Sequence, residues 1–286
     1  MARLIEGLGE VAGGYDVLFS DVWGVIHDGR RAFSEPCSAL TRWRAERGPV
    51  VLISNSPRPT RDVARQMDGL GVPRTAWSRL VTSGDATRAL LAARSPGPAW
   101  RIGPERDAPL YAGLGLAFSK LEDAAFIACT GMEDDETETP EDYRPSLALA
   151  AARGLEMVCA NPDKVVQRGS RLIACGGALA ELYESLGGRV QMAGKPWPPI
   201  YDLAFEQAQT ALGRALERRR VLAIGDGVTT DVAGAQAQGL DVLFVAAGIH
   251  GGAAMGGDGR LDASAVDGLL AAEGAQAQFA MAELVW

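Results

Sequence analysis

Two short apolar runs in this chain each lead into an aspartate. Val17–Ser20 precedes Asp21, and Val221–Ile224 ends two residues before Asp226, with Asp231 five residues further on. In an open α/β sheet, ligands bind at the edge where the carboxyl ends of parallel strands meet. The two runs can therefore bring carboxylates into one crevice, where their oxygens would suit a hard cation such as Mg²⁺.

Asp21 has a possible chemistry of its own. A carboxylate that attacks phosphorus forms an aspartyl-phosphate, which divides one difficult displacement into two easier ones. A strand-end aspartate can equally cap the turn that follows it. Asp231 can likewise cap the helix expected to begin at Val232, so neither residue decides the function alone.

Two further segments could bind phosphate. Ser54, Asn55 and Ser56 follow the apolar run Val50–Ile53, and their hydroxyl and amide groups can donate to phosphoryl oxygens. The ammonium of Lys195 can neutralise a phosphate and an attacking carboxylate together. The plainer interpretations are a Ser/Asn turn and a solvated surface lysine.

Composition restricts the class of protein. The chain has 286 residues, of which 47% are hydrophobic and 22% charged, so one large or two modest globular domains are expected. A net charge of -8 argues against a nucleic-acid partner. No signal peptide or bilayer-spanning segment is apparent, so no membrane partner is expected. Four cysteines without a CxxC pair indicate reduced thiols in a cytoplasmic protein.

Short apolar runs alternate with helical patterns, which predicts a doubly wound, parallel, Rossmann-like α/β sheet. Because the runs are almost uninterrupted, each strand should be covered on both faces. The predicted core strands are Val17–Ser20, Val50–Ser54, Leu80–Thr82, Val221–Ile224 and Val242–Val245. The predicted core helices are Cys37–Arg47, Thr60–Leu70, Ala86–Arg94, Ile200–Leu216 and Val232–Gln238.

A second α/β set of elements interrupts the first, between Trp100 and Gln191. Its predicted strands are Trp100–Ile102, Ala124–Cys129 and Met157–Ala160, and its helices are Ser146–Arg153 and Ala178–Leu186. We expect residues 84–193 to form an inserted domain and residues 1–83 and 194–286 to form the core, with hinges at Gly84 and Gly194.

The order of these features resembles the haloacid dehalogenase (HAD) superfamily. A strand-end Asp, a strand-end Ser, a Lys before a helix and a strand followed by Gly-Asp-x4-Asp occur in that order between Asp21 and Asp231. The insert, with Thr82–Gly84, Cys129–Gly131 and Ala160–Asp163, resembles the class IIA cap subgroup of NagD-like proteins and p-nitrophenyl phosphatases. The resemblance implies a magnesium-dependent hydrolase of small phosphorylated metabolites, acting through an aspartyl-phosphate, with a mobile cap and possible homodimer formation through it.

The resemblance also implies a role for each motif residue. Asp21 would be the nucleophile and a magnesium ligand, Asp226 the second carboxylate on the metal, and Asp231 the residue that orients this set. The phosphate would be bound by Ser54, Asn55 and Lys195, and Lys195 would also take part in catalysis.

Trp23 departs from the family pattern. The family's phosphatases have Asp two residues after the nucleophile, where it protonates the leaving oxygen and activates water. Trp23 still offers the backbone carbonyl that binds the metal there. General acid–base catalysis contributes roughly 10²–10⁴-fold, so slow turnover is expected unless His27 or Asp28 substitutes. The alternatives are a phospho-ligand-binding protein without turnover, and a phosphotransferase or hydrolase acting on another bond.

Two other segments have expected positions. The loop containing His250 should lie at the rim of the crevice, because it follows the last predicted strand. Asn161–Asp163 is interpreted as a turn that fixes the cap.

Overall fold

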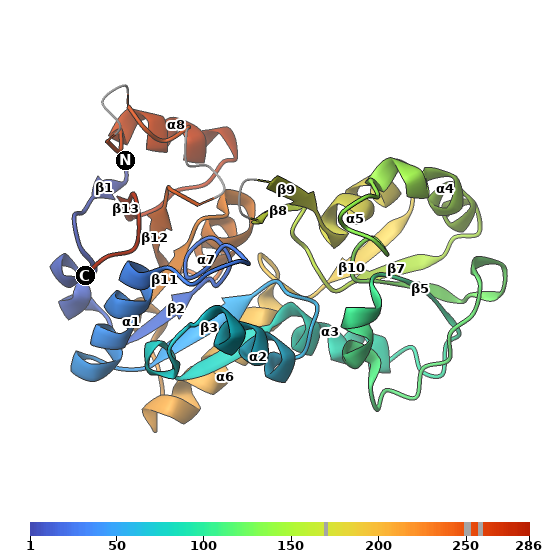
Figure 1. The fold of residues 1–286 in the computed structure, drawn as a ribbon, viewed down its shortest axis with the longest axis horizontal. Helices are drawn as coiled ribbons and strands as arrows, with labels where there is room; N and C mark the ends of the chain where they lie inside the picture. Colours follow the sequence, from blue (N-terminus) through green and yellow to red (C-terminus); the bar gives the residue numbers. More distant parts are fainter. Residues whose placement is uncertain (169–170, 249–252, 257–259) are drawn as a thin grey trace.

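The chain forms two α/β units that lie side by side (Figure 1). The computed structural model describes residues 1–168, 171–248, 253–256 and 260–286. Both termini lie in the core, and the green and yellow segment of Figure 1 forms the cap. The predicted α/β class with an inserted cap is therefore confirmed.

A seven-stranded parallel sheet forms the described part of the core, in the order β1-β13-β12-β11-β2-β3-β4. The chain proceeds outward from β2 through β3 to β4, and outward in the opposite direction from β11 through β12 to β13. The carboxyl ends of β2 and β11 therefore lie at the switch point of the sheet, where such folds bind ligands. The strands are β1 (Arg3–Leu4), β2 (Val17–Ser20), β3 (Val50–Ser54), β4 (Arg79–Thr82), β11 (Val221–Gly225), β12 (Asp241–Val245) and β13 (Phe279–Met281).

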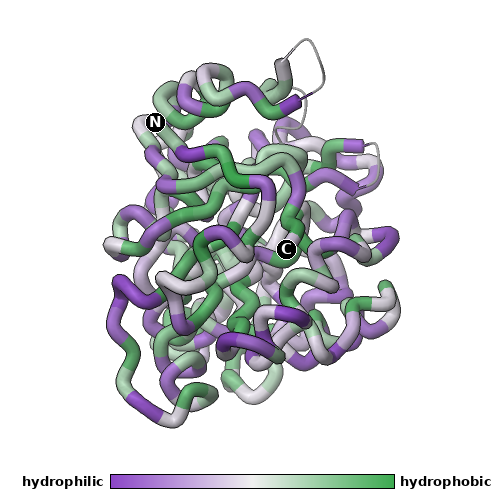
Figure 2. Tube along the Cα trace, turned by 90° about the vertical axis from the view of Figure 1, so that its left-hand side faces the viewer, coloured by the Kyte–Doolittle hydropathy of each residue, from purple (hydrophilic) through white to green (hydrophobic). Residues whose placement is uncertain are grey.

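Alternate residues of the central strands pack on opposite faces of this sheet. Val17 and Phe19 of β2 belong to one hydrophobic cluster, whereas Leu18 belongs to the other. Side chains of a strand alternate between faces, so an uninterrupted apolar run is what a sheet covered on both faces requires. In Figure 2 the hydrophobic segments run through the interior, with hydrophilic residues concentrated in the outer loops.

The core helices occur close to their predicted positions, but their ends differ. The helices are α1 (Ser34–Glu46), α2 (Thr60–Leu70), α6 (Pro198–Leu212), α7 (Ala233–Ala237) and α8 (Ala263–Ala272), together with α3 (Ser83–Ala92), which joins the core to the cap. The prediction that α6 extends to Leu216 is wrong, because Gly213 ends the helix with a left-handed φ of 72°. The predicted start at Val232 is also wrong, because a π-helical turn, Val228–Val232, precedes α7.

The cap has a four-stranded parallel sheet of its own within the described residues, in the order β10-β7-β6-β5. A β8–β9 hairpin extends from the cap toward the core (Figure 1). The cap elements are β5 (Ala99–Ile102), β6 (Phe126–Cys129), α4 (Arg144–Ala152), β7 (Glu156–Cys159), β8 (Val165–Arg168), β9 (Arg171–Ala174), α5 (Gly176–Ser185) and β10 (Arg189–Met192). The predicted strands omit β8, β9 and β10, which are short, partly exposed and carry arginines.

The two connections between core and cap lie next to each other. Helix α3 passes from one unit to the other, since Ala86 packs in the core cluster and Leu91 in a cap cluster. A Cβ on Gly194, in the returning connection, would lie 2.4 Å from Ser83 Oγ at the start of α3. Among the described residues, no helix is long and apolar enough to cross a membrane.

Candidate active site

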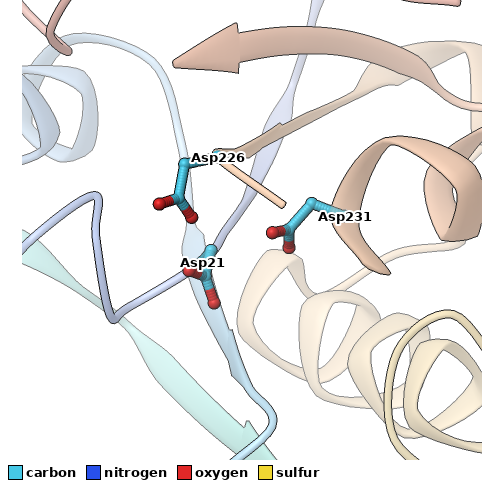
Figure 3. Close-up of side chains that lie close together, drawn as sticks. All are labelled: Asp21, Asp226 and Asp231. Atoms are coloured by element: carbon cyan, nitrogen blue, oxygen red, sulfur yellow. The ribbon is translucent and has the colours of Figure 1, made fainter. Parts of the chain in front are cut away.

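Three carboxylates converge at the switch point of the core sheet. Asp21 follows β2, Asp226 follows β11, and Asp231 lies in the π-helical turn after β11. All three are buried, with exposed fractions of 8% or less. One oxygen of each lies within 4.8 Å of the others, and Figure 3 shows the side chains pointing toward a common space.

Glycines make room for Asp226. Gly24 has a φ of 89°, and a Cβ at this position would lie 2.1 Å from Asp226 Oδ2. A Cβ on Gly248, after β12, would lie 1.9 Å from the same oxygen. Because only glycine tolerates both this φ and such a close approach, the sequence Trp23-Gly24 brings the backbone of the first loop against the carboxylate of the second.

Lys195 binds two of the three carboxylates. Its Nζ donates to Asp21 Oδ1 at 2.5 Å and to Asp231 Oδ1 at 2.6 Å, and the residue is 3% exposed. The interpretation of Lys195 as a surface lysine is therefore wrong. Burial disfavours the ammonium, but the charges of Asp21, Asp231 and Asp163 hold the pKa of Lys195 well above its ordinary value. Lys195 is therefore a permanent cation at this site.

The charges of this cluster fit a divalent cation. Burial raises the pKa of Asp21 well above its usual range, although the Lys195 ammonium opposes that shift. A pKa raised in this way disfavours the Asp21 carboxylate unless a further cation is bound, because three ionised carboxyls and one ammonium carry excess negative charge in a buried space, and such charge requires a partner. Carboxylate oxygens are the ligands that Mg²⁺ prefers. Asp231 also accepts the Gly227 N–H at 3.0 Å, so both of its oxygens are held by hydrogen bonds.

Asn55 links the loop after β3 to Lys195 and to the cap. Its Oδ1 accepts the Lys195 N–H at 2.7 Å, and its Nδ2 donates to the Lys195 carbonyl at 3.1 Å and to Asp163 Oδ1 at 2.8 Å. The side chain of Asn55 thus positions Lys195, so any contact of Asn55 with phosphate falls to its backbone. Ser54 is buried at the same edge, and its Oγ accepts the Ser56 N–H at 3.2 Å.

Asp163 makes a contact that the sequence does not predict. The interpretation of Asn161–Asp163 as a turn within the cap is incomplete, because Asp163 reaches the core through Asn55. Burial raises the pKa of Asp163. No local pattern distinguishes an aspartate that caps its own turn from one that contacts another domain.

Trp23 packs beneath the cap hairpin. Its Nε1–H donates to the Gln167 carbonyl oxygen in β8 at 2.5 Å, and its ring lies edge-on to the His27 ring, with centroids 5.2 Å apart. A Cβ on Gly29, which has a φ of 79°, would lie 2.4 Å from the Trp23 ring. Trp23 thus places, two residues after Asp21, a ring that contacts the cap and supplies no acid.

His27 and Asp28, the nearest candidates in the sequence to substitute for the missing acid, make other contacts here. His27 is 1% exposed and accepts the Gly29 N–H at its Nδ1, and burial lowers its pKa to about 4. The Asp28 carboxylate accepts the N–H groups of Arg30 and Arg31 at 2.9 and 3.0 Å. His27 is therefore neutral near pH 7 and Asp28 stabilises its own turn. His250 lies outside the described residues.

A cavity of about 770 Å³ separates the core cluster from the cap. Asp21, Ser54 and Lys195 line it from the core, and Asp163 lines it from the cap. Arg58 also lines it and is missed by the sequence motifs, although it lies only four residues after Ser54 in the same loop. The volume is that of an ordinary small-molecule site.

Similar proteins share both units. Models of the haloacid dehalogenase-like hydrolase and HAD-hydrolase-like families match residues 18–117 and 192–272. A haloacid dehalogenase-like hydrolase from Brucella suis is 44% identical, with a TM-score of 0.89 over 99% of this chain and 100% of that one. NagD from Escherichia coli, 20% identical, shares the fold with a TM-score of 0.67 over 94% and 96% of the two chains.

A third relative has a named activity. D-glycerol 3-phosphate phosphatase from Mycobacterium tuberculosis is 28% identical over 84% of this chain. The match spans 65% of the length of that protein. A crystal structure of the mycobacterial glycerol phosphate phosphatase with magnesium gives a TM-score of 0.62 over 84% of this chain and 70% of that one. The fold, the motif order and these matches show that the chain belongs to the haloacid dehalogenase-like hydrolases, with a class IIA, NagD-like cap.

Proposed function

We propose that this protein is a magnesium-dependent phosphatase of small phosphate monoesters. The observation that carries the proposal is the buried cluster at the floor of the cavity, in which Lys195 joins Asp21 to Asp231 beside Asp226. A nucleophilic carboxylate, a fixed cation and excess negative charge are the components that phosphoryl transfer requires.

In this proposal Asp21 attacks phosphorus. The new Asp21–phosphorus bond replaces the bond to the ester oxygen, which takes a proton from solvent water and leaves as the alcohol. Water then attacks phosphorus, which releases inorganic phosphate and restores the Asp21 carboxylate. Lys195 orients Asp21 and binds a phosphoryl oxygen, and Ser54 and the Asn55 backbone bind others.

Asp21, Asp226 and the Trp23 backbone carbonyl would hold Mg²⁺, with Asp231 orienting the set. Bound Mg²⁺ would neutralise charge on the phosphoryl group. The position of Gly24 against Asp226 supports the Trp23 carbonyl as a ligand. Structures of the mycobacterial glycerol phosphate phosphatase with magnesium and with calcium also support a divalent metal here.

The cap has a supporting role. We propose that residues 84–193 move as one unit about the adjacent connections at Gly84 and Gly194 and exclude water during the reaction. A homodimer joined through the cap stays a prediction. The four cysteines are free and buried, in agreement with the reducing, cytoplasmic environment that we propose.

Phosphate release tests this function. Purified protein with Mg²⁺ should release phosphate from p-nitrophenyl phosphate and from members of a phosphorylated-metabolite panel, and a chelator should stop the reaction. Asp21→Asn is the matched control, because it preserves the shape of the side chain and removes the nucleophile. Release equal to that of Asp21→Asn for every ester would refute the proposal.

Trp23 favours a second candidate, a phospho-ligand-binding protein that has lost turnover. The packed ring leaves no acid at its position, while Lys195 and Ser54 would still bind phosphate. Binding of a phosphate ester with magnesium, without any phosphate release, would establish this second function in place of the first.

A further inference from the structure

Five cationic side chains line the cavity in the described part of the chain, and four of them pair with carboxylates. The five are Arg58, Arg106, Lys164, Arg168 and Lys195. Arg106 and Arg168 both pair with Asp135, Lys164 pairs with Glu181, and Lys195 pairs with Asp21 and Asp231. In the described part of the chain, no carboxylate oxygen lies within 4.0 Å of a guanidinium nitrogen of Arg58. Arg58 therefore differs from every other cation that lines the cavity.

The guanidinium of Arg58 is held in place and retains donors. Its Nη2 donates to Gln66 Oε1 of α2, and its backbone N–H donates to Ser56 Oγ at 3.3 Å. An arginine has five side-chain N–H donors, and Gln66 takes one of them in the described structure. The Gln66 contact fixes the side chain against α2 without neutralising its charge.

Arg58 loses solvation without gaining an ion pair. Burial lowers the pKa of Arg58, and the carboxyls of Asp107 in the cap and Asp62 in α2 oppose that shift only from beyond ion-pair distance. A partly buried charge without a partner is costly. Such a cost is expected where a ligand supplies the missing charge.

We propose that Arg58 binds a second oxyanion group of the substrate, a carboxylate or a second phosphate, at the end remote from the phosphoester. This inference rests on the proposed phosphatase function and names its substrate class: small phosphate monoesters that carry another anionic group. Ser54 and Arg58 are four residues apart, so their Cα atoms lie at most about 14 Å apart. Both residues line the same cavity as Asp21 and Lys195, so one small ligand in that cavity can contact the two binding positions. The planar fork of arginine suits both kinds of oxyanion.

A matched pair of substrates tests this inference. 3-Phosphoglycerate and glycerol 3-phosphate differ only in a carboxylate against a hydroxymethyl group, and glycerol 1,3-bisphosphate supplies the second phosphate. Wild-type protein should have a higher kcat/KM for an anionic member than for glycerol 3-phosphate. Arg58→Gln should lower that preference by about 10- to 100-fold, as expected for a hydrogen-bonded charge. Arg58→Lys should restore part of it.

Arg61→Gln is the control, because Arg61 lies three residues further on, is 66% exposed in its side chain and pairs with Asp62. It should leave the preference unchanged. If Arg58→Gln lowered kcat/KM equally for all three esters, or left the preference for the anionic esters unchanged, the inference would be overturned while the phosphatase function stayed intact.

Phosphonate analogues test the same preference without turnover. Their carbon–phosphorus bond is not cleaved by the proposed reaction, so binding of 3-phosphonopropionate and 3-hydroxypropylphosphonate can be compared by calorimetry with Mg²⁺ present. The carboxylate analogue should bind more tightly to wild-type protein and lose that advantage in Arg58→Gln. Equal affinities in the wild type would overturn the inference even if no ester were hydrolysed.

Discussion

Trp23, two residues after the proposed nucleophile Asp21, predicts a steep dependence of rate on the leaving group. An aryl oxygen such as p-nitrophenolate departs without a proton, whereas an alkyl oxygen requires one. Trp23 offers only an indole N–H, which is bound to the Gln167 carbonyl. Alkyl phosphates should therefore react slowly relative to aryl phosphates, by something near the roughly 10²–10⁴-fold that acid–base catalysis supplies.

Trp23→Asp should raise the rate of alkyl-phosphate hydrolysis by part of this factor and should change the rate of aryl-phosphate hydrolysis far less. Trp23→Phe is the matched control, because it keeps an aromatic ring, supplies no acid and loses the bond to Gln167. The assay is kcat/KM with Mg²⁺ over a series of esters ordered by the pKa of the leaving alcohol. The slope of this plot should flatten in Trp23→Asp and remain steep in Trp23→Phe.

The cost of these substitutions in stability can be bounded. Losing the hydrogen bond to Gln167 should cost about 0.5–1.5 kcal/mol. Losing the ring should cost less than the roughly 3–5 kcal/mol of a fully buried aromatic residue, because Trp23 is partly exposed. Thermal unfolding of each variant separates this loss from an effect on catalysis. Rapid wild-type hydrolysis of an alkyl phosphate, with no dependence on leaving group, would refute the reasoning and place a proton donor elsewhere in the cavity.

Three further predictions concern buried and paired charges. Asp226→Asn should abolish turnover and weaken Mg²⁺ binding by more than the roughly 10- to 100-fold lost when a residue that only hydrogen-bonds to a metal ligand is replaced. An unchanged Mg²⁺ affinity by calorimetry would exclude Asp226 as a ligand. Lys195→Met should abolish turnover and lower the Tm most strongly without Mg²⁺, because removing one partner of a buried pair costs roughly 3–5 kcal/mol; an unchanged Tm would contradict the ion pairs. Asp16 bonds to Arg214 and Arg220, which lower its pKa, so Asp16→Asn should cost about 1 kcal/mol near pH 7. Since the folded pKa lies below the unfolded one, this difference should begin to shrink as the pH falls through about 3.9 and vanish only below the lower, folded pKa, and a pH-independent difference in urea unfolding would disprove the assignment.

The sequence by itself was sufficient for five of the seven strands of the core sheet and for the strand-end residues. Val17–Ser20 and Val50–Ser54 are continuous apolar runs because both faces of the sheet are covered, and this requirement is visible locally. Asp21 and Asp226 follow such runs, so the topology of a parallel sheet alone brings them to one edge. The edge strands β1 and β13 have two and three residues, too few to show a periodicity.

The tertiary structure decided the contacts between distant segments. Lys195 and Asp21 are 174 residues apart, and Trp23 and Gln167 are 144 apart, so both pairs form only where separate parts of the chain pack together. The tertiary structure also shows that, among the described residues lining the cavity, every cation except Arg58 pairs with a carboxylate. Residue type and local spacing determine which groups stand at the ends of strands, whereas pairing, burial and charge balance depend on how separate units pack, which no local pattern encodes.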